Sequence, residues 1–353
     1  MGVFDEYIHG GNPSQREKTY AWQTAIGLQD VDGLKPSDYL LDSAKRNIEG
    51  DITFDEVKAR IDSYYQSKAG RIDAEDRTEE ADKVSARIAE ILTEPTFNFS
   101  PEYLFQIHRR LFTGVFNHAG SVRVCNMIKK EWVLDGDTVL YSSFDMIGRT
   151  LDYDFREEKN TDYSLLSAQQ AVRHIAKFIS GIWQIHPFRE GNTRTTAVFA
   201  IKYLRNFGFD IDNDVFSSNS WYFRNALVRA NYVNYPKNIH ADLTFLNNFF
   251  ENLLLDTNHP LKNRIMHVNY SQETIDKRNE NFPGTLSDTL DISLDELALL
   301  NNIRTQPRAT QETLASQMRK SVRTVKRLTA SLTQKGYIKR ENGKRDGHWV
   351  ILK

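Results

Sequence analysis

The sequence predicts a mainly α-helical protein, and three patterns support this fold class. Apolar residues recur at helical spacing over long stretches, most clearly between residues 164 and 185. Helix-start signals precede such stretches: Thr53 and Glu56 have the spacing of a capping box, and Ser100 stands before Pro101. The strand-like pattern is confined to short segments.

The N-terminal quarter of the chain is expected to hold few elements. Residues 1–35 are polar and glycine-rich, which favours an irregular arm. Helices are expected over 37–48 and 53–65, and the charged residues 66–82 favour a solvated helix or a connector. We therefore place an N-terminal arm and helical region at residues 1–84.

The central part, residues 85–256, is expected to form one helical domain. A β-hairpin interrupts it at residues 131–141, because Asp135-Gly136 favours a tight turn between short apolar runs. The helices that we expect around the hairpin span residues 100–112, 143–153, 164–185, 192–206, 220–230 and 243–255.

The C-terminal part is expected to follow a linker. Residues 257–290 lose periodicity and collect Pro, Gly and Asn. Within residues 291–353, three short helices (293–305, 311–317 and 321–335) precede a strand pair, which is the order of a winged helix-turn-helix.

Composition indicates an ordinary globular protein. The chain has 353 residues, 40% of them hydrophobic and 26% charged, and no apolar run approaches the length of about 20 residues that a membrane span needs. The first residues lack the apolar core of a signal peptide, so we expect a cytoplasmic protein. The single cysteine, Cys125, excludes an internal disulfide and a cysteine-rich zinc site.

The net charge of −1 conceals an uneven distribution. Residues 301–353 contain 13 Lys and Arg but only three acidic residues, which gives this segment a charge of +10. A basic domain on an acidic body favours a polyanionic partner, and nucleic acid is the first candidate.

The chemistry concentrates in one stretch, His186-Pro-Phe-Arg-Glu-Gly-Asn-Thr-Arg-Thr-Thr196, which leads into an apolar helix. It combines a histidine, a carboxylate, a Gly-Asn turn and an arginine. Helix N-termini bind phosphate because their first N–H groups lack intrahelical partners and the helix dipole is positive there. The stretch therefore indicates phosphate chemistry.

This stretch resembles the signature of Fic domains, H-x-F-x-[D/E]-G-N-[G/K]-R-x-x-R, at His186, Phe188, Glu190-Gly191-Asn192 and Arg194. Phe112, Ala119-Gly120 and Arg123 resemble an upstream stretch of the same family. The similarity covers about residues 85–256. It implies a Fic-type helical bundle with a β-hairpin flap, and transfer of AMP from ATP to a Ser, Thr or Tyr hydroxyl of a target protein.

The resemblance also implies a role for each matching residue. His186 would be the general base, since an imidazole titrates near neutral pH. Glu190 would hold Mg²⁺ against the nucleotide phosphates, because this cation prefers oxygen ligands. Arg194 would neutralise charge during transfer. Backbone donors for the phosphates would come from Gly191, Asn192 and Thr193.

Two positions depart from the signature. Thr193 replaces the usual Gly or Lys, and Ala197 replaces the second arginine, which in the family contacts the γ-phosphate. Doc toxins also lack this arginine and transfer the γ-phosphate. Adenylyl transfer leads, while a Doc-like kinase and a DNA-binding regulator with the Fic body as sensor stay open as alternatives. The alternative to a functional site is that His186 merely caps a helix end and that Glu190 and Arg194 form a surface ion pair.

Further assignments rest on the resemblance alone. An inhibitory helix in the family carries a glutamate, and Glu49 is the nearest match, although a surface glutamate is almost as good an explanation. Trp132, Val133 and Leu134 would form the target-binding flap, with Trp132 equally suited to packing. Asn225 and Tyr232 would line the base or ribose site, although aromatic residues at this density commonly pack in cores.

The basic C-terminal segment contains a candidate recognition helix at residues 321–335. Arg323, Thr324 and Arg327 are expected to project from it toward DNA, and the charge would supply salt-dependent affinity. Protein contact is the alternative use of such a fold. The oligomeric state stays open, with a homodimer among the options.

Overall fold

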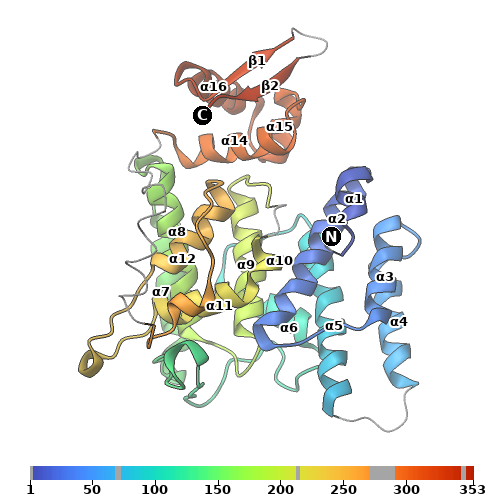
Figure 1. The fold of residues 1–353 in the computed structure, drawn as a ribbon, viewed down its shortest axis with the longest axis vertical. Coiled ribbons are helices and arrows are strands. Elements are labelled where there is room, and N and C mark those ends of the chain that lie inside the picture. Colours follow the sequence, from blue (N-terminus) through green and yellow to red (C-terminus); the bar gives the residue numbers. More distant parts are fainter. Residues whose placement is uncertain (1–2, 68–72, 212–214, 271–290, 343–346) are drawn as a thin grey trace.

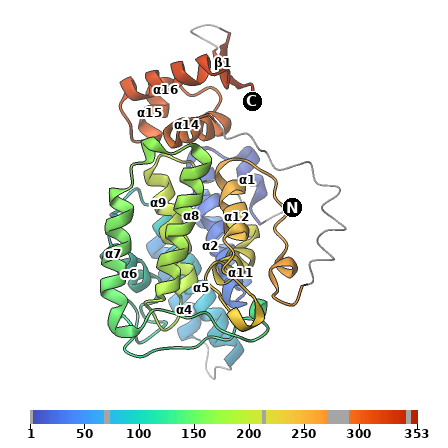
Figure 2. The same ribbon diagram turned by 90° about the vertical axis from the view of Figure 1, so that its left-hand side faces the viewer.

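The computed structural model describes residues 3–67, 73–211, 215–270, 291–342 and 347–353. It confirms the mainly helical fold class. N-terminal helices lie along one side of a central helical body, and a small domain with a two-stranded sheet sits on one end of that body (Figures 1 and 2). Within the described ranges, no helix combines the length and apolar character needed to cross a bilayer.

The N-terminal region is more regular than the sequence predicts. The expected irregular arm instead contains α1 (Asp5–Gly10), α2 (Pro13–Gly27) and a 3₁₀ turn, η1 (Leu28–Asp32). The signal for α2 is local: Asn12 and Gln15 form a capping box, and Pro13 is the first helical residue. Tertiary packing then fixes the helix, because its Trp22 is fully buried and donates a hydrogen bond to Asn47 at 3.0 Å.

The next three helices complete this region. α3 (Asp38–Glu49) and α4 (Phe54–Gln66) agree with the prediction, including the Thr53–Glu56 capping box. The charged stretch forms α5 (Asp73–Thr93), which packs against α2 and also contacts the central body. Because α5 crosses residue 84, the proposed domain boundary falls inside one helix.

The central body is built around α8 (Ala168–Ile185), which buries its apolar face, and α9 (Asn192–Asn206), which is almost wholly buried. Every residue of α9 from Asn192 to Leu204 is buried. The surrounding helices are α6 (Pro101–Phe112), α7 (Ile147–Asn160), α10 (Val215–Ser218), α11 (Ser220–Ala230) and α12 (Thr244–Leu254); short 3₁₀ turns are η2 (Trp132–Leu134), η3 (Phe144–Met146), η4 (Tyr163–Leu165), η5 (Tyr235–Lys237) and η6 (Asn263–Met266).

The hairpin expected over residues 131–141 does not form. Its centre is η2, and no residue from 131 to 141 belongs to a strand. Val133 and Leu134 are both buried, whereas a half-buried strand turns successive side chains to opposite faces. The backbone of Val133 also accepts a hydrogen bond from Val268 at 3.0 Å, so tertiary contacts replace strand pairing.

The C-terminal domain has the expected winged-helix order. It comprises α14 (Leu294–Thr305), α15 (Gln311–Gln317), α16 (Val322–Gln334), β1 (Ile338–Glu341) and β2 (His348–Ile351). The strands pair antiparallel, with Ile338 opposite Ile351. Most of the proposed linker, residues 271–290, lies outside the described residues.

Hydrogen bonds hold this small domain on the central body. Asn302 Nδ2 donates to the Gly208 carbonyl at 2.7 Å, and Asn301 accepts from the Asp210 N–H at 2.8 Å. Ala168 N–H also donates to Ile292 at 2.9 Å. The domain therefore sits at the end of α9 opposite to His186 and Asn192 (Figure 1).

Candidate functional site

The candidate site is the loop between α8 and α9. His186 ends α8 in the left-handed conformation, with φ of 52°, and Gly191 precedes α9 with φ of 74°. A Cβ at Gly191 would collide with the Phe112 ring, so both the backbone conformation and the space require glycine there. The sequence therefore folds into a sharp turn that delivers Glu190 to the N-terminus of a buried helix.

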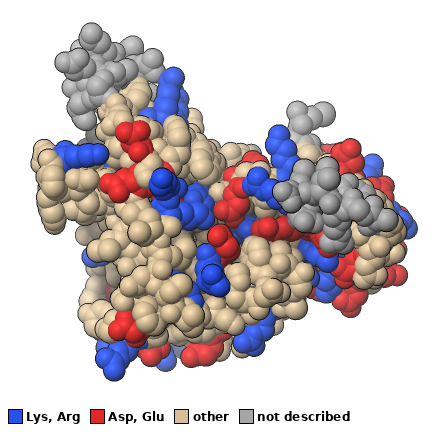
Figure 3. All heavy atoms as spheres, turned by 90° about the horizontal axis from the view of Figure 1, so that it is seen from below, with Lys and Arg blue, Asp and Glu red and all other residues tan. Residues whose placement is uncertain are grey.

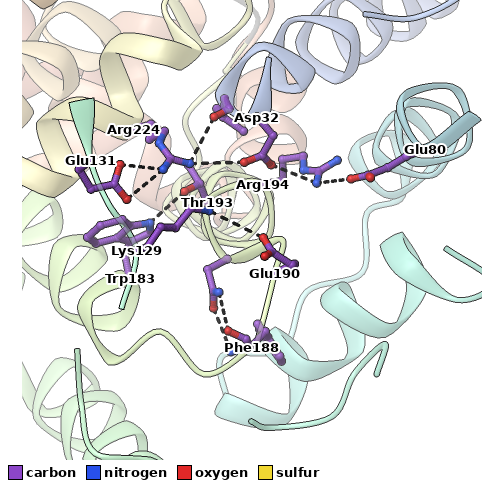
Figure 4. A network of polar contacts seen from close by, with 12 residues as sticks. Asp32, Glu80, Lys129, Glu131, Trp183, Phe188, Glu190, Thr193, Arg194 and Arg224 are labelled. Atoms are coloured by element: carbon purple, nitrogen blue, oxygen red, sulfur yellow. Dashed lines mark hydrogen bonds and ion pairs between the residues drawn. The ribbon is translucent and has the colours of Figure 1, made fainter. Parts of the chain in front are cut away.

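Internal hydrogen bonds hold the loop in one shape. The Asn192 side chain accepts from Phe188 N–H at 3.0 Å and donates to the Phe188 carbonyl at 2.8 Å (Figure 4). Thr193 accepts from the Trp183 indole at 3.0 Å. The Asn192 and Thr193 side chains therefore already have partners within the protein. At these two positions, the first turn of α9 can offer an anion its backbone N–H groups.

His186 is buried and electrically neutral. Burial lowers the pKa of its imidazole well below the ordinary value, and the positive charge of Lys129 adds to this effect. Nδ1 lies 3.3 Å from the Trp183 carbonyl, and the Tyr141 ring stacks on the imidazole at 4.0 Å. With the Nδ1 proton directed at that carbonyl, Nε2 carries the lone pair that a general base needs.

A pocket of about 670 Å³ opens beside this loop. Its lining includes Glu190 and Arg194 from the motif. Four acidic and four basic residues line it in all, so the wall is close to neutral: Asp30, Asp32, Glu80 and Glu190 against Arg77, Lys129, Arg194 and Arg224. Acidic and basic side chains are interspersed over the middle of the face that Figure 3 shows.

Arg194 is already occupied by side chains of the N-terminal region. Its guanidinium donates to Glu80 at 2.6 Å and to Gln29 at 3.1 Å, and it lies 3.0 Å from Asp32. The guanidinium also lies over the Phe112 ring, 4.9 Å from its centre. The arginine is thus held in place at the pocket, but two carboxylates take the position of an anionic ligand (Figure 4).

A second ion-pair network joins Glu131, the first residue of the expected hairpin, to α11. Arg224 donates to both carboxylate oxygens of Glu131, at 2.7 and 2.9 Å, and both side chains are buried. Asp32 lies 3.3 Å from Arg224 and 3.0 Å from Arg194, so it bridges these two arginines of the pocket. This network fixes the backbone that carries Lys129.

The flap residues fall into two groups. Trp132 is half exposed and contacts His267, so it is accessible to a target. Val133 and Leu134 are buried in the core, and the expectation that they contact a target directly is wrong for this conformation. The error follows from the missing hairpin, because η2 turns both apolar side chains inward.

Three other assignments do not meet the pocket. Asn225 is fully buried and donates to Asn263 at 2.8 Å, and Tyr232 donates to Asp137 at 2.6 Å. Neither residue lines the pocket, and the lining also lacks four residues of the motif: His186, Gly191, Asn192 and Thr193. The exposed Glu49 accepts a hydrogen bond from Tyr7, whereas the carboxylates at Arg194 belong to Asp32 and Glu80, so the prediction that Glu49 points at the site is wrong.

Two residues that position the loop were not identified from the sequence. His108 accepts from the Gly120 N–H at 2.8 Å through Nδ1, donates to the Glu190 carbonyl at 3.1 Å through Nε2, and stacks on Phe188 at 3.7 Å. Arg123 Nε donates to the His186 carbonyl at 2.8 Å. Arg123 matches the upstream stretch of the family, but the resemblance implied no role for it. No local sequence pattern indicated the role of His108, because its partners lie far along the chain.

The exposed face of α16 presents the predicted DNA contacts. Arg323 and Arg327 are exposed, while Thr324 is half-buried and serves the helix cap, its N–H donating to Ser321 at 3.1 Å. α14 lies between the central body and α16 (Figure 1). The candidate recognition helix is thus accessible on a side of the domain that the body does not cover.

Comparison with known proteins gives family matches on two separate parts of the chain. Residues 98–204 match the Fic/DOC family, and residues 292–348 match the MarR family. The chain is similar to protein adenylyltransferase VbhT of Bartonella schoenbuchensis, with 27% identity over 158 residues, which cover 41% of this chain and 32% of that protein. It therefore spans about a third of the length of that relative.

Two further proteins are similar over comparable stretches. A probable protein adenylyltransferase, y4lH of Sinorhizobium fredii, is 28% identical over 149 residues, covering 41% of this chain and 71% of that protein. The crystal structure of BepC from Bartonella tribocorum with bound AMPPNP is 20% identical, covers 51% of this chain and 86% of that chain, and superposes with a TM-score of 0.40.

Proposed function

We propose, from the premise that residues 98–204 form a Fic/DOC domain, that this chain is a protein adenylyltransferase that transfers AMP from ATP to a hydroxyl of a target protein. One arrangement supports this function above all others. A single loop joins the neutral, buried imidazole of His186 to a pocket at the N-terminus of a buried helix, and four basic and four acidic residues line that pocket. A base and a phosphate-binding wall are the two parts that such a transfer requires.

The reaction follows from these parts. His186 Nε2 takes the proton of a Ser, Thr or Tyr hydroxyl, and the hydroxyl oxygen attacks the α-phosphorus of ATP. The bond from this phosphorus to the bridging oxygen breaks, and pyrophosphate leaves. Arg194 and the N–H groups of Gly191, Asn192 and Thr193 stabilise the charge on the phosphates, so positioning and electrostatics account for the catalysis without a covalent intermediate.

Mg²⁺ fits the pocket as a partner of the nucleotide. Glu190 offers an exposed carboxylate there, and oxygen is the ligand that this cation prefers. Among the described residues, no group of three His, Cys, Asp or Glu side chains gathers to bind a metal. Mg²⁺ commonly uses one or two carboxylates together with substrate phosphates, so Glu190 would hold it and the ion would offset phosphate charge.

Exposed apolar side chains near the site suit a protein as acceptor. Val124, Ile128 and Leu140 are each about 80% exposed, on the segment that also carries Lys129 and Glu131. Apolar side chains on one exposed segment are a common feature of protein-binding surfaces. This surface is the candidate for docking the target segment whose hydroxyl reaches His186.

The C-terminal domain is proposed to bind DNA. Its MarR-family match and the exposed Arg323 and Arg327 on α16 support this role, and its basic charge supplies attraction for phosphates. The chain would then carry an enzyme and a DNA-binding module together, and it would bind DNA in the cytoplasm.

Labelled ATP tests the proposed enzyme directly. The full chain is incubated with Mg²⁺, a bacterial lysate as acceptor, and ATP labelled on either the α- or the γ-phosphate. We expect α-label on protein, and none with His186→Ala. γ-Label on protein would instead indicate the Doc-like kinase, and no label from either nucleotide would leave the DNA-binding regulator as the function.

A further inference from the structure

The pocket lacks one cation that the family signature provides, because the second arginine of that signature is missing from the motif. Ala197 occupies that position and is fully buried in α9, so it presents no charge to the pocket. A nucleoside triphosphate carries several negative charges on its terminal phosphates. Another cation in the pocket must therefore meet them if ATP is the substrate.

Two of the remaining basic residues already make contacts with the pocket wall, and of these Arg224 is neutralised by carboxylates. Arg224 is paired with both oxygens of Glu131 and with Asp32. Arg77 donates to the Asp32 carbonyl at 2.9 Å from an exposed position at the rim. Neither guanidinium is available without loss of a contact that holds the pocket wall together.

Lys129 differs from both arginines. Its ammonium has one ion-pair partner among the described residues, the carboxylate of Glu190 at 3.7 Å, which exceeds hydrogen-bond length. The side chain is 31% exposed and lines the pocket across from the motif loop. A group that approaches the Glu190 carboxylate thus meets the Lys129 ammonium as well.

The backbone that carries Lys129 is held firmly. Lys129 N–H donates to Thr138 at 3.2 Å, and Glu131 N–H donates to Asp137 at 2.9 Å. The Glu131 carboxylate is buried on Arg224. The segment therefore presents the lysine from a fixed base, while four rotatable bonds let the ammonium follow a phosphate.

We propose that Lys129 binds the terminal phosphates of the nucleotide and supplies the contact that Ala197 leaves open. The inference rests on the proposed function, since it assigns a residue to the same ATP site. A lysine ammonium is a compact point charge with three donors, which suits phosphate oxygens that lack a fixed orientation. Specificity for triphosphate over monophosphate then comes from residues 121–131 rather than from α9.

Nucleotide binding separates this role from a structural one. Affinities of the full chain for ATP, ADP and AMP are measured by calorimetry with Mg²⁺ for the native protein, Lys129→Ala, Lys129→Arg and Lys130→Ala. Lys130 is the matched control, because it is the exposed neighbour and does not line the pocket. Circular dichroism of each variant checks that the fold is kept.

Lys129→Ala should weaken ATP and ADP binding by about tenfold or more, the value of one hydrogen bond to a charged group, and leave AMP binding unchanged. Lys129→Arg should restore most of the ATP affinity, and Lys130→Ala should match the native protein. Equal ATP affinity in Lys129→Ala and native protein would overturn the inference. Absence of ATP binding and of α-label transfer in the native protein would instead reject the proposed function.

Discussion

Arg194, at the start of α9, donates a 2.6 Å hydrogen bond to Glu80, which lies 114 residues earlier on α5. The arginine side chain is 2% exposed, and Asp32 adds a second carboxylate at 3.0 Å. The N-terminal region thus fills the anion-binding position of the motif with two carboxylates of its own. A phosphate that binds Arg194 must displace at least one of them.

Removal of the Glu80 charge should therefore strengthen nucleotide binding. In Glu80→Gln the amide keeps the shape of the side chain but no longer competes electrostatically with phosphate. We expect ATP affinity to rise by up to about tenfold, since charged hydrogen bonds contribute about 1.5–3 kcal/mol. Calorimetry measures the change, with Glu79→Gln as control because Glu79 pairs with Lys83 instead. Weaker ATP binding in Glu80→Gln would contradict the competition.

The His186 imidazole should matter for transfer but not for binding. His186→Ala removes the base and should lower the rate of α-label transfer by about 10²–10⁴-fold, the usual contribution of a general base. ATP affinity should stay within twofold, roughly the noise of such a comparison, since Arg194 and Glu190 remain. His240→Ala on the exposed surface serves as control. A full rate in His186→Ala would show that another group takes the proton.

Protonation of His108 should destabilise the fold in acid. Burial lowers the pKa of this histidine from 6.5 to about 4, while the unfolded chain keeps the ordinary value. Between these values the unfolded state binds more protons, so the free energy of unfolding falls as pH falls from 6.5 to 4. The loss is on the order of 3 kcal/mol at about 1.4 kcal/mol per pH unit.

His108→Gln is the variant that checks this dependence. Denaturant unfolding is followed at several pH values between 4 and 7, and the variant should show a shallower loss of stability in acid than the native protein. His186 contributes in the same direction, because burial lowers its pKa too, so part of the slope should remain. An unchanged slope in His108→Gln would assign the acid sensitivity to other groups.

The Glu131–Arg224 pair should contribute strongly to stability. Glu131→Ala leaves a buried guanidinium with Asp32 as its remaining charged partner, and we expect a loss of about 3–5 kcal/mol in the free energy of unfolding. Glu157→Ala is the control, since its pair with Arg156 is exposed and should contribute under about 1 kcal/mol. Similar losses of unfolding free energy in the two variants would show that burial does not determine how much an ion pair contributes to stability.

DNA binding should depend on the exposed face of α16. Arg323→Ala with Arg327→Ala should weaken a gel shift and reduce the slope of log affinity against log salt by about two, one for each lost phosphate contact. Arg304→Ala on α14 is the control, because it pairs with Asp256 at 3.5 Å. Unchanged binding by the double variant would favour a protein partner for this domain.

The elements predicted correctly are those whose signals are local. The helix starts at Thr53 and Ser293, the apolar face of α8 and the turn at Gly191 each depend on signals within a few residues. The prediction failed where packing between distant segments decides the conformation. α2 forms in a segment expected to be irregular because Trp22 packs against Asn47 of α3 and Phe54 of α4. Residues 131–141 lose their strands to contacts with Val268.

The sequence by itself determined the helical fold class, the motif His186–Arg194 and the basic winged-helix segment, because each depends on periodicity or on spacing within one stretch. Tertiary structure decided which charges share the pocket. Asp32, Glu80, Lys129 and Arg224 come from four separate segments, and their pairing depends on packing that no local pattern encodes. The same packing neutralises His186 and places Val133 and Leu134 in the core.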